Sequence, residues 1–132
     1  MEQWRASIEM PAVRYGPAAA RRFVAALLPT WGLGHLADDA QLVVSELFTN
    51  AFQHASESHS LNLELIGYPD SVRICLADGS AVRPVIAELA PDRPSGRGMR
   101  IVSALAAEWG AEDHAGGKRV WVELGPADQA QR

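Results

Sequence analysis

One stretch of the sequence, residues 36–55, restricts the possible folds more than any other part of the chain. Apolar residues recur there at helical spacing, so the stretch predicts an α-helix of about five turns. The start of this helix is apolar on every side, whereas its end has one polar stripe. The stripe consists of Glu46, Thr49, Asn50, Gln53 and His54. A surface helix would be polar along its whole length, so the pattern predicts a core helix whose last turns border a site.

Strand and helix patterns alternate through the rest of the chain. Residues 4–10 alternate apolar and polar side chains and predict a half-buried strand, and residues 18–28 have helical spacing. Strands are also predicted at 61–65, 72–76 and 120–124, the first two joined as a hairpin by the turn at 67–70. After Gly98 a last helix is expected to run through Trp109 to a Gly110 cap. This order predicts an α+β two-layer sandwich, in which helices cover one face of a mixed, mainly antiparallel sheet.

Length and composition limit the class of protein. The 132 residues suffice for one domain, which we place at residues 1–125, followed by a polar tail at 126–132. The net charge of −4 argues against direct nucleic-acid binding, whose usual mark is a basic surface. The single cysteine, Cys75, excludes an internal disulfide and a cysteine-cluster metal site, and it predicts a buried, inert thiol. Without a signal-like or membrane-spanning stretch, we expect a cytoplasmic protein with no membrane partner.

The polar stripe carries a specific chemistry. Glu46 and Asn50 are four residues apart and therefore neighbours on one helix face. A carboxylate can act as a general base, and an amide oxygen suits a hard cation such as Mg²⁺, which is often held by few protein oxygens and substrate phosphates. By itself the stripe also fits a plainer interpretation, a solvated or helix-capping polar patch.

Two further motifs fit a nucleotide site. Asp78-Gly79 ends a predicted strand, where a carboxylate can accept a hydrogen bond from an amine such as adenine N6, although Asp-Gly is also a common turn pair. Gly96-Arg97-Gly98 opens the last helix, where free backbone N–H groups can bind an anion; the plainer alternative is a hinge before a helix start. Residues 80–95, between the two motifs, contain three prolines and no periodicity, which predicts a lid or binding loop.

Together, in this order, the motifs resemble the GHKL (Bergerat-fold) ATP-binding domains, above all the small anti-sigma-factor serine kinases and their stand-alone relatives. Residues 46–55, ELFTNAFQHA, resemble the N box of that branch, and residues 76–80, LADGS, resemble its first glycine box. Residues 96–102, GRGMRIV, resemble the second glycine box, and residues 116–124, GGKRVWVEL, the terminal strand. The resemblance covers nearly the whole chain.

The resemblance implies a role for each matching residue. Asn50 would be the Mg²⁺ ligand, Glu46 the base for the attacking hydroxyl, and Asp78, followed by Gly79, the partner of the adenine amine. The residues along the phosphates would be Gly96, Arg97, Gly98 and Met99, with His54 near them and residues 80–95 as the ATP lid. The cofactors would be ATP or ADP with Mg²⁺.

By the same resemblance, the chain would be a protein-serine kinase that binds a sigma factor and phosphorylates an anti-anti-sigma partner of the STAS fold. The alternative is a nucleotide-sensing interaction module without catalysis. The lid motivates this alternative, as does Arg119, which stands where the family commonly has threonine and has no hydrogen-bond acceptor. A homodimer is a further expectation, because a sheet covered on one side leaves its other face free. Trp4 and Trp121 are candidates to line that face or, more plainly, to fill the core.

Overall fold

The computed structural model describes residues 3–11, 15–54, 60–78, 97–114 and 117–126 of the chain. In chain order its elements are β1 (Trp4–Pro11), α1 (Gly16–Thr30), the short 3₁₀ helix η1 (Gly34–Leu36), α2 (Ala37–His54), β2 (Ser60–Gly67), β3 (Val72–Asp78), α4 (Arg97–Leu105), β4 (Glu108–His114) and β5 (Gly117–Leu124). The first strand, the central helix and the hairpin of β2 and β3 are therefore present where the sequence pattern predicted them.

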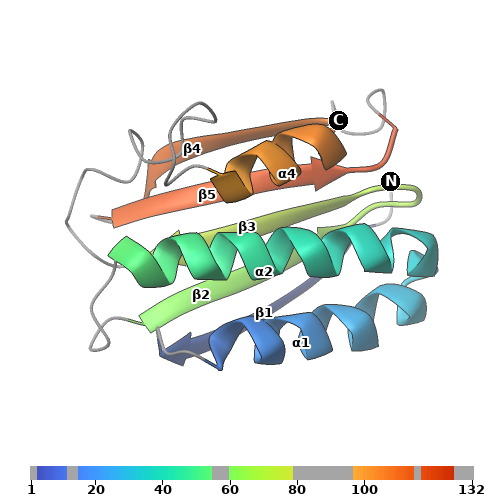
Figure 1. Cartoon of the computed structure of the whole chain (residues 1–132). Helices are drawn as coiled ribbons and strands as arrows, with labels where there is room; N and C mark the ends of the chain where they lie inside the picture. The colour runs from blue at the N-terminus through green and yellow to red at the C-terminus, as the bar shows by residue number, and fades with distance from the viewer. Residues whose placement is uncertain (1–2, 12–14, 55–59, 79–96, 115–116, 127–132) are drawn as a thin grey trace.

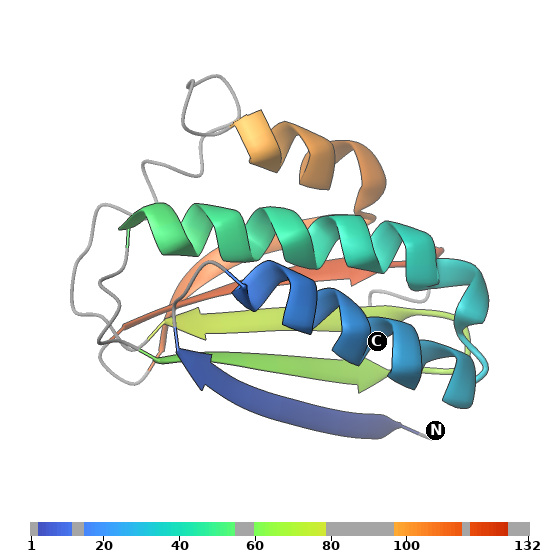
Figure 2. The same cartoon turned by 60° about the horizontal axis from the view of Figure 1, so that its bottom comes forward.

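The strands form one open sheet in the order β1-β2-β3-β5-β4. All the described strand pairs are antiparallel. Helices α1, α2 and α4 lie side by side on one face of the sheet, and no described helix lies on the other face (Figures 1 and 2). The predicted α+β class, with helices on one face, is confirmed. Within the described ranges, no helix has the length and the apolar character needed to cross a lipid bilayer.

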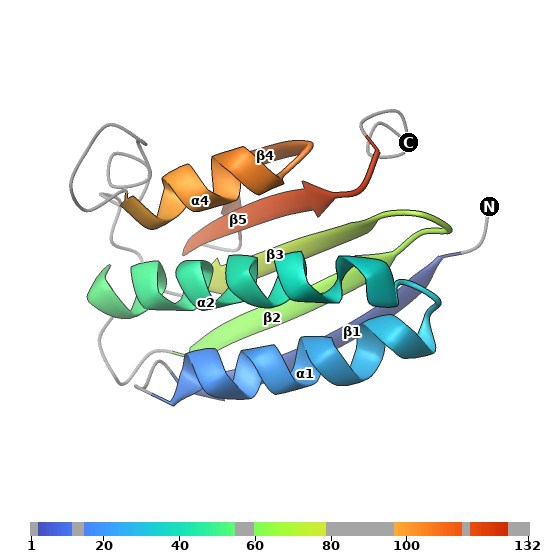
Figure 3. The same ribbon diagram turned by 45° about the vertical axis from the view of Figure 1, so that its right-hand side comes forward.

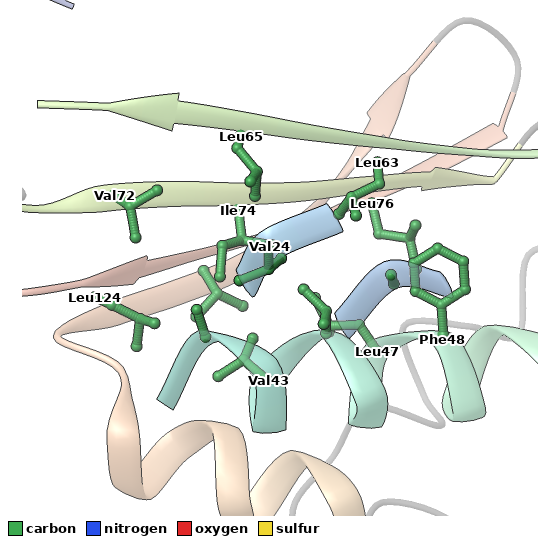
Figure 4. Packing of buried hydrophobic residues seen from close by; sticks show 14 of the residues in the cluster. Val24, Val43, Leu47, Phe48, Leu63, Leu65, Val72, Ile74, Leu76 and Leu124 are labelled. Carbon is green, nitrogen blue, oxygen red and sulfur yellow. The ribbon is translucent and has the colours of Figure 1, made fainter. Parts of the chain in front are cut away.

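Alternation along the strands gives the sheet two different faces. On β2 and β3, the residues under the helices are Leu63, Leu65, Ile74 and Leu76, each at most 4% exposed. Figure 4 shows this layer meeting side chains of both long helices, among them Val24, Val43, Leu47 and Phe48. Burying a side chain of this size contributes about 1.5–3 kcal/mol, so this layer is the main interaction holding the helices on the sheet.

The two long helices pack against each other across the same core. On α1, Ala20, Val24 and Leu28 follow one another at intervals of four residues and are fully buried. Pro29 and the pair Gly32 and Gly34 are the breaks that the sequence predicts after this helix, and Pro29 lies inside the last turn of α1. The chain turns at Gly32, whose φ of 75° is a left-handed conformation that glycine adopts without strain.

The sequence pattern misplaced the end of the last helix. α4 ends at Leu105 and residues Glu108–His114 form β4, so the expected helix through Trp109 with a Gly110 cap is wrong. The backbone N–H of Ala107 donates to the carbonyl of Glu123, 2.8 Å away, just before β4 starts to pair with β5. Apolar spacing favoured a helix there because local periodicity contains no information about a neighbouring strand.

The two candidate tryptophans lie on opposite faces of the sheet. Trp4 is on the helix-covered face, where its ring stacks on that of Trp31 with the centroids 6.4 Å apart. Trp121 is on the open face, and the guanidinium carbon of Arg73 lies 4.5 Å from the centroid of its ring. Only Trp121 therefore lines the open face, whereas Trp4 packs at the edge of the core.

Candidate functional site

The three motifs singled out in the sequence meet at one end of the molecule. The C-terminal end of α2, the C-terminal end of β3 and the N-terminal end of α4 lie at the same end of the fold (Figures 1 and 3). Residues 46–54, Asp78 and residues 97–99 belong to these three ends. Elements that are distant in the sequence thus end close together, and the N-terminal end of α4 adds free backbone N–H groups, which can bind a charged ligand.

Asn50 is the most distinctive residue of the polar stripe. It is 8% exposed, whereas its neighbour Thr49 is exposed to solvent. Within the described part of the chain, the Asn50 amide has no hydrogen-bond partner. An amide without a partner among the described residues offers one acceptor oxygen and two N–H donors to a ligand atom.

Glu46 lies one turn before Asn50 and is half-buried, without an ion pair to any described residue. The two side chains offer carboxylate and amide oxygens. Mg²⁺ is commonly held by one or two protein oxygens and completes its shell with substrate phosphates and water, so these donors fit a magnesium–nucleotide site. They do not form an all-protein metal cage, and the described residues contain no group of three or more His, Cys, Asp and Glu side chains that could hold an ion.

A contact between α1 and α2 supports the turn that carries Glu46. Arg21 Nη1 donates a hydrogen bond to Ser45 Oγ at 2.8 Å, and Ser45 directly precedes Glu46 in α2. The bond therefore fixes this turn of α2 beside α1. Sequence reasoning missed the contact because it joins two separate helices, and no local pattern relates their residues.

The remaining predicted residues are placed by backbone position. Asp78 is the last residue of β3, in register with Leu61 of β2 and Lys118 of β5. His54 is the last residue of α2, and Arg97, Gly98 and Met99 begin α4, where backbone N–H groups lack intrahelical partners. Gly79, Gly96 and residues 80–95, expected to form the lid, lie outside the described residues.

Arg119 lies on the open face, away from these residues. Its Nε donates to Glu112 Oε2 at 2.9 Å, and its Nη2 bonds the same oxygen. The hydrogen bond to Glu112 is the main cause that raises the pKa of Arg119. The residue of β5 in register with Asp78 is Lys118.

The open face has a hollow of its own, with a volume of about 290 Å³. It is lined by Arg5, Asn62, Glu64, Cys75, Ala77 and Arg119. All of these residues alternate to the side opposite the helices, so the hollow is separate from the site at the end of α2. Burial raises the pKa of the Cys75 thiol, although nearby Arg73 and Arg119 act in the opposite direction. A buried thiol held in its protonated form is a poor nucleophile, which agrees with the inert cysteine predicted from the sequence.

Comparison with known proteins adds independent findings. Residues 13–124 match the family model of the histidine kinase-like ATPase domain. Among solved structures, the histidine kinase domain of a blue-light-activated histidine kinase from Erythrobacter litoralis EL346 is similar, with a TM-score of 0.57 and 20% sequence identity. That match covers 92% of this chain and 64% of the other chain, so this chain spans less than two thirds of its length. No curated protein matches the sequence. At this identity the structural likeness shows a shared fold.

Proposed function

Because the chain belongs to the family of histidine kinase-like ATPase domains, an ATP-binding and kinase-like class, we propose that it is a protein-serine kinase using Mg-ATP. Its substrate would be a serine on a partner of the STAS fold, and it would also bind a sigma factor. The observation that carries the proposal is the pair Glu46 and Asn50, a half-buried carboxylate one turn before a buried amide that has no partner among the described residues. The resemblance of the motifs to anti-sigma-factor serine kinases supports the choice of partners.

Phosphoryl transfer depends mainly on positioning and on neutralising charge, so few side chains suffice. In the proposed reaction the serine Oγ forms a bond to the γ-phosphorus, the bond from that phosphorus to the β,γ-bridging oxygen breaks, and ADP leaves. Glu46 accepts the proton of the serine hydroxyl. Asn50 would hold Mg²⁺, which when bound would neutralise the phosphate charge.

The other residues of the site would bind the nucleotide. Asp78 accepts a hydrogen bond from the N6 amine of adenine, and Gly79 lets the backbone come close to the base. The start of α4, with Arg97, Gly98 and Met99, would offer free N–H groups to the phosphates, and Gly96, which precedes it in the sequence, is proposed to join them; His54 lies at the neighbouring end of α2. The convergence of these three ends of α2, β3 and α4 supports a single ligand in contact with all of them.

The first test is calorimetric titration of the wild type and of Asn50→Ala with Mg-ADP and Mg-ATP. We expect Asn50→Ala to weaken binding by about 10- to 100-fold, because it removes a hydrogen-bonding group that acts on a charged ligand. Thr49→Ala is the matched control, since the neighbouring Thr49 is exposed and should leave affinity unchanged. Chelation of Mg²⁺ should remove most of the difference in nucleotide affinity between the wild type and Asn50→Ala. Equal binding of Mg-ADP by both proteins would place the site elsewhere.

The second test measures transfer of the γ-phosphate from labelled ATP to candidate STAS-fold partners. Glu46→Gln should slow transfer by about 100- to 10,000-fold while leaving the affinity for Mg-ADP nearly unchanged, because a general base acts on the chemical step. If the wild type binds nucleotide but transfers no phosphate, the kinase proposal is wrong. Nucleotide-dependent partner binding that survives Glu46→Gln would then identify the alternative, an interaction module without catalysis.

A further inference from the structure

Strand β1 forms one edge of the sheet and presents its outer side to solvent. Among the described strands it pairs with β2 alone, and in Figure 2 the blue strand has no described neighbour on its other side. The unpaired backbone groups of such an edge can bind a further strand, and proteins often block it with prolines, bulges or charges. Residues 4–10 of β1 contain no proline and carry one charge of each sign, Arg5 and Glu9, placed symmetrically about Ser7.

We propose that β1 of a second copy of this chain pairs with this edge, antiparallel to the first and related to it by a two-fold axis at Ser7. In this register Arg5 of each copy lies directly opposite Glu9 of the other. Both residues are exposed, and Glu9 forms no ion pair with any described residue. Arg5 already binds Glu64 at 3.0 Å, but a guanidinium has five N–H donors and can hold a second carboxylate.

Charge complementarity selects this register from the possible ones. Residues that lie directly opposite each other must point to the same face of the sheet, so the two-fold axis has to pass beside a residue. An axis at Arg5 or at Glu9 would bring like charges together, which destabilises a strand pair. An axis at Ala6 would place Arg5 opposite Ser7, and an axis at Ile8 would place Glu9 opposite Ser7. Only the axis at Ser7 pairs both charges with their opposites.

The same register also joins apolar residues on the helix-covered face. Ala6 would lie opposite Ile8 of the second copy, and Trp4 would lie opposite Met10. All four side chains are half-buried in the single chain, although they point toward the core side of the sheet. A small residue opposite a large one lets the side chains interdigitate, and a methionine sulfur makes favourable contacts with an aromatic ring. Pairing would therefore bury apolar surface that the single chain leaves partly exposed.

Helix α1 adds apolar side chains along this edge. Arg21 lies on the side of α1 that is hydrogen-bonded to α2, whereas Phe23 and Leu27 lie about 120–160° around the helix from it. Trp31, at the end of α1, stacks on Trp4 of β1, so the side of α1 away from α2 faces the β1 edge. Phe23 and Leu27 pack against the core but are only half-buried. In the proposed dimer the two copies of α1 would meet across the axis and cover these side chains.

The opposite edge of the sheet lacks this complementarity. Strand β4 carries Glu108 and Glu112 on the open face, and its sequence contains no lysine or arginine. An axis at Gly110 would place Glu108 of one copy opposite Glu112 of the other, and the two carboxylates would repel each other. A second copy is therefore expected at β1 and not at β4, so the assembly closes as a dimer with one ten-stranded sheet.

The inference does not depend on the proposed function. Pro11 pairs with Ser60 and Leu61 pairs with Asp78, so the end of β1 at Pro11 lies at the end of the sheet that carries the candidate site. Because the second strand runs in the opposite direction, the two candidate sites would lie at opposite ends of the joined sheet. Variants that separate the copies should therefore keep the wild-type affinity for Mg-ADP.

The first test is sedimentation equilibrium of the full chain at several concentrations. The wild type should approach twice the mass of one chain, which is 14.2 kDa. Arg5→Glu and Glu9→Arg each place like charges opposite one another and should weaken dimerisation by about 10- to 100-fold. The double variant Arg5→Glu/Glu9→Arg should regain most of the wild-type affinity. Arg22→Glu makes the same change of charge at an exposed residue of α1 and should leave the dimer intact.

Mixing the two single variants tests the pairing directly. One copy then has glutamate at both positions and the other has arginine at both, so every charge meets its opposite only in the mixed dimer. The mixture should form heterodimers more tightly than either variant forms homodimers, and added salt should reduce the difference. If Arg5→Glu fails to fold because it also loses its partner Glu64, circular dichroism will show it, and Glu9→Arg together with the cross-linking below still decides the question.

Cross-linking tests the position of the axis. Ser7→Cys should be joined to a second copy by a short bifunctional maleimide, because the two cysteines would lie opposite each other. Gln3→Cys is the matched control, since the two residues would be about 27 Å apart along the joined strands. The wild type, whose single cysteine Cys75 is buried, gives the background. A wild type that stays monomeric at all concentrations would overturn the inference. So would a dimer that Glu9→Arg leaves unchanged and that Ser7→Cys does not cross-link, because its interface would lie elsewhere.

Discussion

The helix-covered face of the sheet and its open face are filled by different interactions. Under the helices, side chains such as Leu63 and Ile74 are fully buried and interdigitate with α1 and α2 (Figure 4). On the open face, arginines are paired with carboxylates: Arg5 with Glu64 at 3.0 Å, Arg73 with Glu123 at 3.1 Å, and Arg119 with Glu112. The first face contributes most of the folding free energy, because exposed ion pairs contribute little compared with apolar burial.

The open face nevertheless contains buried groups. Cys75 and Glu123 are each 4% exposed there, although no described helix covers them. Long side chains such as Arg73, which lies against Trp121, therefore provide the cover. The homodimer expected from the sequence stays a prediction, and on this face a partner would meet mainly charged groups and the hollow between Arg5 and Arg119.

The largest contrast between the faces is expected for two consecutive residues of β2. Leu63→Ala should reduce the free energy of unfolding by about 2–5 kcal/mol, because it removes a fully buried side chain and leaves a cavity. Asn62→Ala, on the open face, should cost less than about 1 kcal/mol. Urea denaturation of both variants measures the difference. Equal losses would mean that the open face contributes as much to stability as the core.

A smaller contrast is expected for two glycines that each lie against a tryptophan ring. A Cβ on Gly67 would come within 2.6 Å of Trp31 Cε3, and a Cβ on Gly110 within 2.8 Å of Trp121 Cζ2. Gly67→Ala should reduce the free energy of unfolding by about 1–3 kcal/mol, because the Trp31 ring is held by its stack on Trp4 and cannot easily move away from the new methyl group. Gly110→Ala should cost less, since Trp121 on the open face can move outward. Thermal unfolding measures both, and a larger loss for Gly110→Ala would contradict this view of the open face.

The smallest effects separate two ion pairs within the open face. Arg73→Met should reduce the free energy of unfolding by about 1–2 kcal/mol. The change removes the guanidinium group that forms an ion pair with Glu123, whose side chain is only 6% exposed. Arg5→Met should cost less than about 1 kcal/mol, since the side chains of Arg5 and Glu64 are 59% and 23% exposed. Denaturation with and without added salt checks the ranking. If Arg5→Met were the more damaging change, burial would not govern the strength of these pairs.

Much of the fold could be predicted from local patterns. Alternation in residues 4–10, 61–65 and 72–76 predicted three strands with the correct buried face, and the polar end of α2 marked the helix that borders the site. These signals are local because the period of a strand or a helix is set by backbone geometry. β4 was missed because its apolar residues also fit a helix, and only its pairing with β5 distinguishes the two.

For the candidate site, the sequence determined which residue types are present and, through alternation and helical period, which of them can share a face. It therefore singled out Glu46, Asn50 and Asp78. Only the tertiary structure decided that Asn50 is buried without a partner among the described residues, and that Lys118 rather than Arg119 is in register with Asp78. Those facts depend on which strands pair, and in which register, between residues far apart in the chain, and a local period does not encode them.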